Sequence, residues 1–156
     1  MDYSYQHLTP TDLPLFKELL RIFGEAFEEL PTYQDNIPRD EYLTSILGKD
    51  HFIALVARGE DKVVGGLAAY VLEKFEQERK EIYIYDLAVA KDHRRKGIAT
   101  GLIRTLQSIA HEKGAYVIFV QADPGDEPAI KLYESLGTRE DVHHFDIPVV
   151  PLSKLE

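Results

Sequence analysis

The stretch YIYDLAVAKDHRRKGIATGLIRTL, residues 83–106, decides the fold because it holds a strand, a turn and a helix in succession. The strand-like run ends at Val89, and a helical pattern of apolar residues begins near Gly97. The turn between them carries HRRK, the densest basic cluster of a chain whose formal net charge is -9. The stretch therefore predicts positive charge gathered at the mouth of a helix.

This basic turn is typical of a phosphate site, because the unpaired N–H groups of a helix N-terminus attract phosphate. Gly97 and Ala99 let the backbone approach a ligand closely, and Arg94 and Arg95 add charged donors. The Walker A pattern does not fit, since Lys96 precedes the glycine, and positions 97, 99 and 102 do not match the dinucleotide pattern. We interpret the turn as holding the phosphates of a nucleotide-containing cofactor. The alternative is a solvated basic helix start.

The composition excludes several classes of function. An acidic chain lacks the basic face that nucleic acid requires, so its charge favours a cationic partner, with simple solubility as the alternative. The chain has no cysteine, which excludes disulfides, thiolate metal ligands and a cysteine nucleophile. It contains no apolar run long enough for a membrane span, and MDYSYQHLTP does not resemble a signal peptide. We therefore expect a cytoplasmic protein with no membrane contact.

The apolar periodicity predicts one domain over residues 1–156 with a mixed α/β sheet. Thr9 and Asp12 have the spacing of a capping box before the first helix. Residues 115–122 form a nearly all-apolar run, typical of a strand buried on both faces. An antiparallel meander then leads into a strand–helix–strand crossover. The predicted helices are 13–30, 38–47, 97–113 and 127–136, residues 31–38 form a loop, and the predicted strands are 51–58, 63–72, 81–89, 115–122 and 143–150.

Two motifs resemble those of the GNAT acetyltransferase superfamily. Arg94-x-x-Gly97-x-Ala99 is similar to its Arg/Gln-x-x-Gly-x-Gly/Ala motif and follows the strand end DLAV. Further on, GDEPAIKLYESLG resembles Asn-x-x-Ala-x-x-Leu-Tyr-x-x-x-Gly, with Asp126 in place of the asparagine and Thr138 in place of the usual aromatic residue. The two motifs occur in the expected order, and the resemblance spans residues 52–147.

This resemblance implies the GNAT fold, with acetyl-CoA as the acetyl donor and a sheet that splays open after Val89 to admit it. It also implies that Tyr133 protonates the departing thiolate, since the pKa of a phenol, about 10, is close to that of a thiol. The residues that the resemblance assigns to the cofactor are Leu87, Ala88, Val89, Arg94, Arg95, Lys96, Gly97, Ile98, Ala99, Thr100 and Ala129.

Carboxylates gather where the carboxyl ends of the central strands place the ligand crevice of a mixed sheet. We predict Asp86 as the base that takes the proton of an attacking amine, directly or through a water, with Glu81 as the alternative. The alternative for Asp123 and Asp126 is that they form turns, and the alternative for Asp86 is that it is a satisfied polar group near a bulge. The predicted substrate-binding residues are Tyr33, Asp123, Asp126, Glu127, His144 and Asp146, with Tyr33 in a loop that walls a small pocket.

A closer resemblance is to the type I aminoglycoside 3-N-acetyltransferases, which confer gentamicin resistance. It rests on FIALVA, VVGGLAAYVLEKFEQERKEIYIYDLAV, HRRKGIAT, GAYVIFVQAD-GD-PA and HFDI, and it departs at Pro124, where the family has an aromatic residue. Aminoglycosides are polycations, in agreement with the acidic cluster. Because the chain has no thiol to carry an acetyl group, we expect direct attack by the amine; an acyl-enzyme on serine has no motif behind it.

No metal is predicted. HEKGA lacks the second histidine of a zinc motif, because position 115 is alanine. His143 and His144 fit better at the mouth of the substrate pocket or on the surface of a strand.

Two alternative functions remain open at the level of sequence. One keeps the fold and the donor but acetylates a polyamine or a protein amine; the other is a non-catalytic module that binds acetyl-CoA. The family resemblance also implies a homodimer, which the C-terminal IPVVPLSKLE could help to form.

Overall fold

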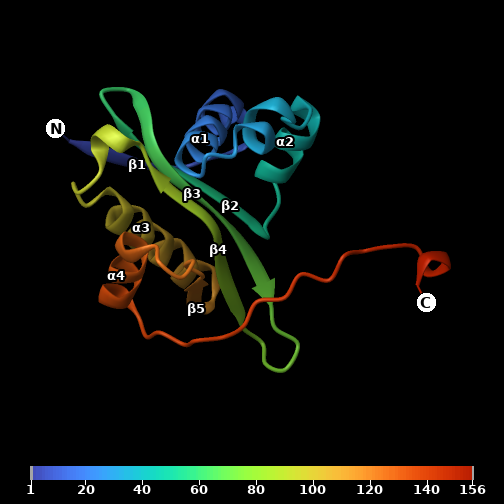
Figure 1. The fold of residues 1–156 in the computed structure, drawn as a ribbon. Helices are drawn as coiled ribbons and strands as arrows, with labels where there is room; N and C mark the ends of the chain where they lie inside the picture. The colour runs from blue at the N-terminus through green and yellow to red at the C-terminus, as the bar shows by residue number, and fades with distance from the viewer. Residues whose placement is uncertain (1, 156) are drawn as a thin grey trace. The chain divides into compact units, whose positions relative to one another are not determined.

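A five-stranded sheet organises the computed structural model, which describes residues 2–155 (Figure 1). The first four strands are antiparallel neighbours, and the last strand runs parallel to the fourth. The strand order along the sheet is the order in the chain: β1 (Tyr3–His7), β2 (Phe52–Gly59), β3 (Lys62–Glu73), β4 (Lys80–Val89) and β5 (Ala115–Val120). The mixed α/β fold with a strand–helix–strand crossover is therefore confirmed.

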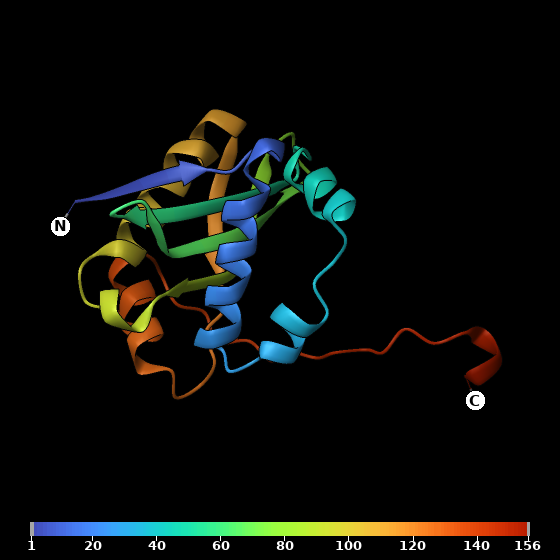
Figure 2. The same cartoon turned by 90° about the horizontal axis from the view of Figure 1, so that it is seen from above.

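Helices cover both faces of this sheet. Figures 1 and 2 show α1 (Leu13–Ala26) and α2 (Asp40–Leu47) on one face and α3 (Ile98–Lys113) on the other. The predicted capping box is present, because the Thr9 N–H donates to Asp12 Oδ2 at 2.8 Å; it caps a 3₁₀ turn (Pro10–Asp12) that leads into α1. The crossover helix α3 ends at Gly114, as expected for a left-handed C-cap.

The α1 side of the core is closely packed on β3. A side chain at Gly66 would overlap the Leu55 carbonyl and the Leu19 side chain, so the glycine lets α1 lie directly on the strand. The Leu19 side chain is fully buried at this contact. Close packing here fixes α1, and the turn that follows it, above the sheet.

Several predicted boundaries were wrong. The strand β1 was missed, because YSYQH has little apolar patterning and forms an edge. The predicted first helix ends at Ala26 rather than at residue 30, and the predicted loop contains a π-helical turn (Pro31–Asp35). The predicted strand 143–150 is absent from the described residues, where this segment has no regular structure. The strand β5 is not buried on both faces, since Tyr116 and Val117 are exposed.

The chain divides into two compact units, residues 1–121 and residues 122–156. The first contains the sheet and α1 to α3. The second contains α4 (Glu127–Leu136), the predicted fourth helix, and an irregular C-terminal segment that ends in a 3₁₀ turn (Leu152–Lys154). None of the helices within residues 2–155 combines the length and apolarity that a membrane span requires.

Candidate active site

A bulge in β4 turns two consecutive side chains to the same face of the sheet. The pairing of β3 with β4 joins Ala69 to Ile84 and Ala68 to Asp86, which leaves Tyr85 without a partner of its own. In a regular strand, neighbouring side chains point to opposite faces. The extra residue lets Asp86 lie on the α1 side of the sheet together with Tyr85.

The carboxylate of Asp86 is partly buried and is held by Tyr33. The Tyr33 hydroxyl donates to Asp86 Oδ2 at 2.8 Å, and the Tyr33 ring meets Phe23 of α1 edge-on. Burial raises the pKa of Asp86 above its usual 3.8, and the hydrogen bond from Tyr33 opposes part of that rise. Burial also raises the pKa of Tyr33, so its hydroxyl stays protonated and donates. Asp86 therefore has an increased affinity for a proton and a fixed orientation.

The other predicted base, Glu81, is in a different environment. Its Oε2 accepts from the Tyr116 hydroxyl at 2.8 Å and lies 3.4 Å from Lys74 Nζ. The hydrogen bond from Tyr116 and the pairing with Lys74 hold the pKa of Glu81 below its ordinary value. Two carboxylates whose pKa values are shifted in opposite directions are suited to different roles in acid–base chemistry. Asp86 is suited to accept a proton, whereas Glu81 serves as a charged anchor for its neighbours.

An aromatic wall, formed by Tyr70, Tyr83, Tyr85 and Phe119, extends from Asp86 across the sheet. Tyr85 meets both Tyr70 and Tyr83 edge-on with ring centroids 5.9 Å apart, and Tyr83 stacks on Phe119 at 4.7 Å. Tyr85 is 60% exposed, which leaves part of its ring available to a ligand. The aromatic wall provides flat apolar surfaces beside a carboxylate.

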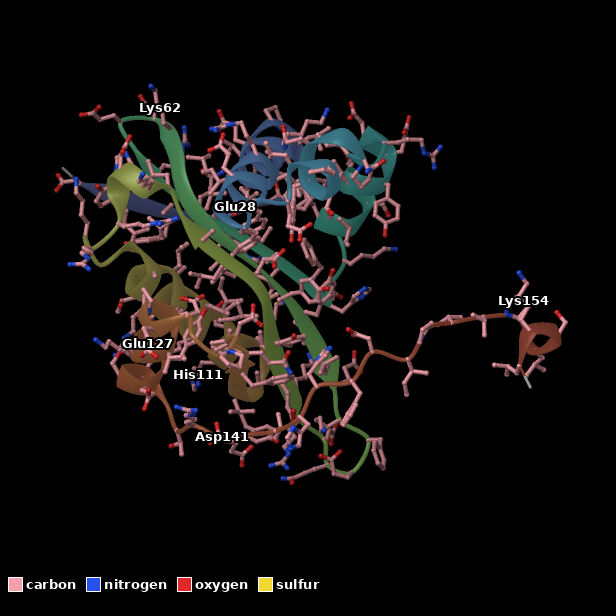
Figure 3. The ribbon with its side chains drawn as sticks, viewed as in Figure 1. Glu28, Lys62, His111, Glu127, Asp141 and Lys154 are labelled. Atoms are coloured by element: carbon pink, nitrogen blue, oxygen red, sulfur yellow. The ribbon has the colours of Figure 1, made fainter. Side chains whose placement is uncertain are left out.

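A hollow with an acidic lining lies where the chain leaves α1. Its lining consists of Gly24, Glu25, Glu28, Leu30 and Pro31. Figure 3 labels Glu28 in this region. Arg21 Nη1 donates to Glu25 Oε1 at 2.8 Å, so Glu28 supplies the carboxylate of this hollow that could favour a cationic ligand. The sequence analysis missed both glutamates, because they lie at the end of an amphipathic helix and resemble ordinary solvated residues.

The edge of β4 that faces β5 is free of strand partners over its last part. The parallel pairing of β4 with β5 ends at Ile84 and Val120, although β4 continues to Val89. The predicted opening after Val89 was therefore placed too late, since the strands separate where the bulge bends β4. Residues 85–89, which include the predicted Leu87, Ala88 and Val89, keep their pairing to β3.

The predicted phosphate turn has the expected conformation. Gly97 is the N-cap of α3 with φ of +79°, and a side chain there would meet no atom within 4 Å. Arg95 also has a positive φ of +62°, which is uncommon for a residue with a side chain and is typical of functional turns. Arg94 Nε donates to the Val89 carbonyl at 3.2 Å, and His93 Nδ1 lies 3.0 Å from the Tyr3 hydroxyl. These two contacts fix the turn from both sides.

The remaining predicted site residues lie in the unit formed by residues 122–156. Asp126 caps α4, because its Oδ1 accepts from the Ala129 N–H at 3.4 Å. His144 Nε2 lies 2.9 Å from Asp146 Oδ1. Burial, together with the charge of Asp126, raises the pKa of Tyr133. This unit also contains the predicted Asp123 and Glu127. Over residues 2–155, no three His, Asp or Glu side chains gather as metal ligands would.

The fold and the basic turn before α3 agree with the class of protein that the family comparison identifies. The model of the Acetyltransferase (GNAT) family matches residues 15–138, so the chain belongs to the GNAT acetyltransferase family.

The most informative relatives are solved structures. An aminoglycoside acetyltransferase from an uncultured soil metagenomic sample is 56% identical with a TM-score of 0.94, covering 96% of this chain and 100% of the relative. Another from such a sample, in complex with sisomicin, is 37% identical with a TM-score of 0.88, covering 95% and 97% of the two chains. The N-acetyltransferase 8 of Homo sapiens is 31% identical over 90 residues, which are 58% of this chain and 40% of that protein. The chain thus matches less than half the length of this curated relative.

The sequence analysis also missed the aromatic wall and the anchoring of Glu81. The alternation of tyrosines at 83 and 85 in β4 could have indicated that one face of this strand lacks a helix above it. The pairing of Glu81 with Lys74 and Tyr116 joins three elements of the fold, and no local pattern in the sequence indicates it.

Proposed function

We propose that this protein transfers the acetyl group of acetyl-CoA to an amine of an aminoglycoside, at the 3-N position of gentamicin-type compounds. The observation that carries the proposal is the Tyr33–Asp86 pair, a carboxylate of raised pKa at the end of the aromatic wall. An amine acceptor needs a group that removes its proton before it can attack.

The residues of the phosphate turn fit acetyl-CoA. Open space at Gly97, the free N–H groups of α3 and three basic side chains suit a pyrophosphate. The unpaired β4 edge at residues 87–89 suits the amide groups of the pantetheine arm, which need backbone partners. Bound there, acetyl-CoA supplies an activated acetyl thioester. The residues that would hold it are Leu87, Ala88, Val89, Arg94, Arg95, Lys96, Gly97, Ile98, Ala99, Thr100 and Ala129.

In this proposal Asp86 acts as the general base. At neutral pH an aminoglycoside amine is mostly protonated, and its nitrogen has no lone pair for attack. Asp86 accepts that proton, directly or through a water, and Tyr33 keeps the accepting oxygen in position. As the new N–C bond forms, the bond between carbonyl carbon and sulfur breaks, and the nitrogen releases its second proton to solvent, from which the Tyr133 hydroxyl is afterwards restored. Tyr133, assigned by the family motif, donates a proton to the departing sulfur.

The charge and shape of the acceptor side support a polycationic sugar. Glu28 in the hollow attracts an ammonium group, and the exposed ring of Tyr85 offers an apolar face to a sugar. The names of the two soil relatives support the same acceptor class. Asp123, Asp126, Glu127, His144 and Asp146 are proposed to contribute further contacts.

The proposal is tested by measuring thiol release from acetyl-CoA with gentamicin, sisomicin, spermidine and a lysine-rich peptide as parallel acceptors. We expect turnover with the two aminoglycosides and little with the others. The acetylated position is then assigned by NMR of the purified product. Turnover confined to spermidine or the peptide would replace the acceptor class, and binding of acetyl-CoA without turnover by any acceptor would favour the non-catalytic module.

A further inference from the structure

The basic turn before α3, residues 91–97, has few backbone hydrogen bonds of its own. Its first part is a 3₁₀ turn (Lys91–His93), which ends where the Arg94 N–H donates to the Lys91 carbonyl at 3.4 Å. Within residues 2–155, the N–H groups of residues 95–97 have no backbone acceptor. Backbone that receives a phosphate keeps its N–H groups free in this way. The segment therefore depends on contacts from elsewhere to hold its shape.

Two residues of this segment have left-handed backbone conformations. Arg95 and Gly97 have φ of +62° and +79°. Glycine takes such a φ readily, but a residue with a side chain keeps it only where the surrounding structure enforces it. The conformation at Arg95 is therefore imposed by the contacts that hold the turn.

Tyr3 of β1 supplies one of these contacts from 90 residues away in the chain. Its hydroxyl lies 3.0 Å from His93 Nδ1, and the two rings meet edge-on with centroids 5.8 Å apart. Figure 1 shows the start of β1 beside this turn, which is drawn in yellow. The contact of Arg94 with the Val89 carbonyl, by comparison, spans only five residues. Tyr3 thus ties the turn to a strand that is distant in the sequence.

The strand β1 is less firmly held than the rest of the sheet. It is the first strand and, among the described residues, pairs only with β2. None of its five residues is fully buried. Elements with few buried contacts open locally at a lower free energy than the core. The contact between β1 and the turn can therefore form and break without unfolding of the central strands.

We propose that Tyr3 is a positioning residue for the cofactor. Its hydroxyl holds the His93 imidazole, and through it keeps residues 95–97 in the conformation that receives the phosphates of acetyl-CoA. The inference rests on the proposed function in taking acetyl-CoA as the ligand of this turn. Because linkage is reciprocal, a ligand that binds better when β1 is in place also holds β1 in place. Acetyl-CoA binding and the contact of β1 with the turn therefore stabilise each other.

Removal of the Tyr3 hydroxyl separates binding from catalysis. Tyr3→Phe keeps the ring and its edge-on contact with His93 but cannot hydrogen-bond. We expect the Kd of acetyl-CoA, measured by calorimetry without any acceptor, to rise about three- to tenfold, the range for loss of one hydrogen bond. The KM for acetyl-CoA should rise in parallel, while kcat at saturating acetyl-CoA stays within about twofold of wild type.

Variants of His93 provide a rescue of the same contact. His93→Asn places an amide oxygen near the position of Nδ1, where it can accept from the Tyr3 hydroxyl, so its Kd should stay near wild type. His93→Leu has no acceptor and should bind acetyl-CoA as weakly as Tyr3→Phe. Combining Tyr3→Phe with His93→Leu should add no further loss, because both changes remove one and the same hydrogen bond.

Tyr5→Phe is the matched control from the same strand. Tyr5 shares the face of β1 with Tyr3, but it lies against Gly101 of α3 rather than against His93. Its variant should keep the wild-type Kd for acetyl-CoA. An equal rise in Kd for Tyr3→Phe and Tyr5→Phe would overturn the inference, because the effect would then come from the strand as a whole.

A readout independent of activity follows β1 directly. Hydrogen exchange of the β1 amides is measured for each protein without ligand and with saturating acetyl-CoA. We expect the ligand to slow this exchange in the wild type and in Tyr5→Phe, and much less in Tyr3→Phe. Exchange in the first turn of α3 should slow in all three proteins, which shows that each of them is loaded.

Three results would overturn the coupling between Tyr3 and the cofactor turn. They are an unchanged Kd in Tyr3→Phe, a loss of kcat without a loss of affinity, and equal protection of β1 by acetyl-CoA in wild type and Tyr3→Phe. Wild-type protein that does not bind acetyl-CoA would overturn the proposed cofactor together with this inference. Normal binding by the wild type with any of the three results would overturn this inference alone. The two failures are therefore distinguishable, and neither measurement of binding involves an acceptor.

Discussion

Tyr33 and Asp86 are 53 residues apart in the chain, yet the Tyr33 hydroxyl donates to the Asp86 carboxylate at 2.8 Å. Two separate features of the fold produce this contact. The π-helical turn after α1 carries Tyr33 over the sheet, and the bulge in β4 turns Asp86 toward it. The pair fixes one carboxylate oxygen and leaves the other without a hydrogen bond from the described side chains, which is the arrangement that a proton acceptor needs.

We expect Asp86→Asn to lower kcat by about 100-fold or more, in the range that general bases contribute. The asparagine keeps an oxygen for Tyr33 but cannot take a proton. The measurement is steady-state thiol release together with acetyl-CoA affinity by calorimetry, which should change little. Glu81→Gln is the matched control, because that carboxylate is engaged by Tyr116 and Lys74, and its kcat should stay near wild type. A larger loss in Glu81→Gln than in Asp86→Asn would reverse the assignment.

The same variant should make the protein more stable at neutral pH. Because the pKa of Asp86 is raised by folding, the folded state binds a proton that the unfolded state has lost, and stability falls as pH rises through that range. At neutral pH the wild type therefore contains a carboxylate whose charge is destabilising. We expect a higher Tm for Asp86→Asn at pH 7, with the advantage shrinking as the pH approaches 4. An advantage that grows at low pH would contradict the direction of this pKa shift.

Removal of the Tyr33 hydroxyl should shift the pH dependence of the reaction. The hydrogen bond from Tyr33 lowers the pKa of Asp86, so Tyr33→Phe lets that pKa rise further. We expect the acidic limb of the kcat/KM profile to move to higher pH, with a loss in kcat of about tenfold from the less constrained base. A uniform loss at every pH would mean that Tyr33 only shapes the pocket.

Alanine substitutions at the two glycines that flank α3 distinguish an effect on phosphate binding from an effect of backbone strain. Gly97 and Gly114 have φ of +79° and +82°, and a side chain at either would meet no atom within 4 Å. Alanine at either position should lower stability by about 1 kcal/mol, the cost of a left-handed residue with a side chain. We expect Gly97→Ala alone to raise the KM for acetyl-CoA severalfold. Equal KM values in the two variants would argue against a phosphate site at Gly97.

The proton donor is tested by Tyr133→Phe. Loss of the hydroxyl should lower kcat by about 10- to 100-fold, as expected when a positioned acid is removed. The affinity for acetyl-CoA should change less than twofold, because the ring stays in place. Single-turnover measurements with a donor whose thiol leaves more easily provide the check, since a better leaving group should restore part of the rate. Equal losses of rate and affinity would indicate a binding role.

The sequence was most informative where local chemistry determines the structure. The strand to Val89, the basic turn and the helix after Gly97 were predictable, because a glycine, adjacent charges and a 3.6-residue period act over a few residues. The bulge at Tyr85 was not predictable, since it depends on how β4 pairs with β3. The roles of Glu81 and Tyr33 were equally hidden, because their partners come from distant parts of the chain.

The predicted strand 143–150 shows a different limit. The alternation in residues 143–150 is typical of a strand, but a strand forms only when an edge is available to pair with it, so the prediction was wrong. Among residues 2–155, no backbone–backbone hydrogen bond involves this segment.

The bulge also makes β4 unusual in its tolerance of changes in length. In a regular strand, losing one residue reverses every following side chain and would turn a buried face outward. Tyr85 has no partner on β3, so a chain without it would keep Ile84 opposite Ala69 and Asp86 opposite Ala68. A one-residue deletion at this position would straighten the strand and remove one ring from the acceptor side while leaving the hydrophobic core in register. Variation in chain length at Tyr85 can therefore reshape the proposed acceptor site. A one-residue deletion elsewhere in β4 would turn buried side chains outward and prevent folding.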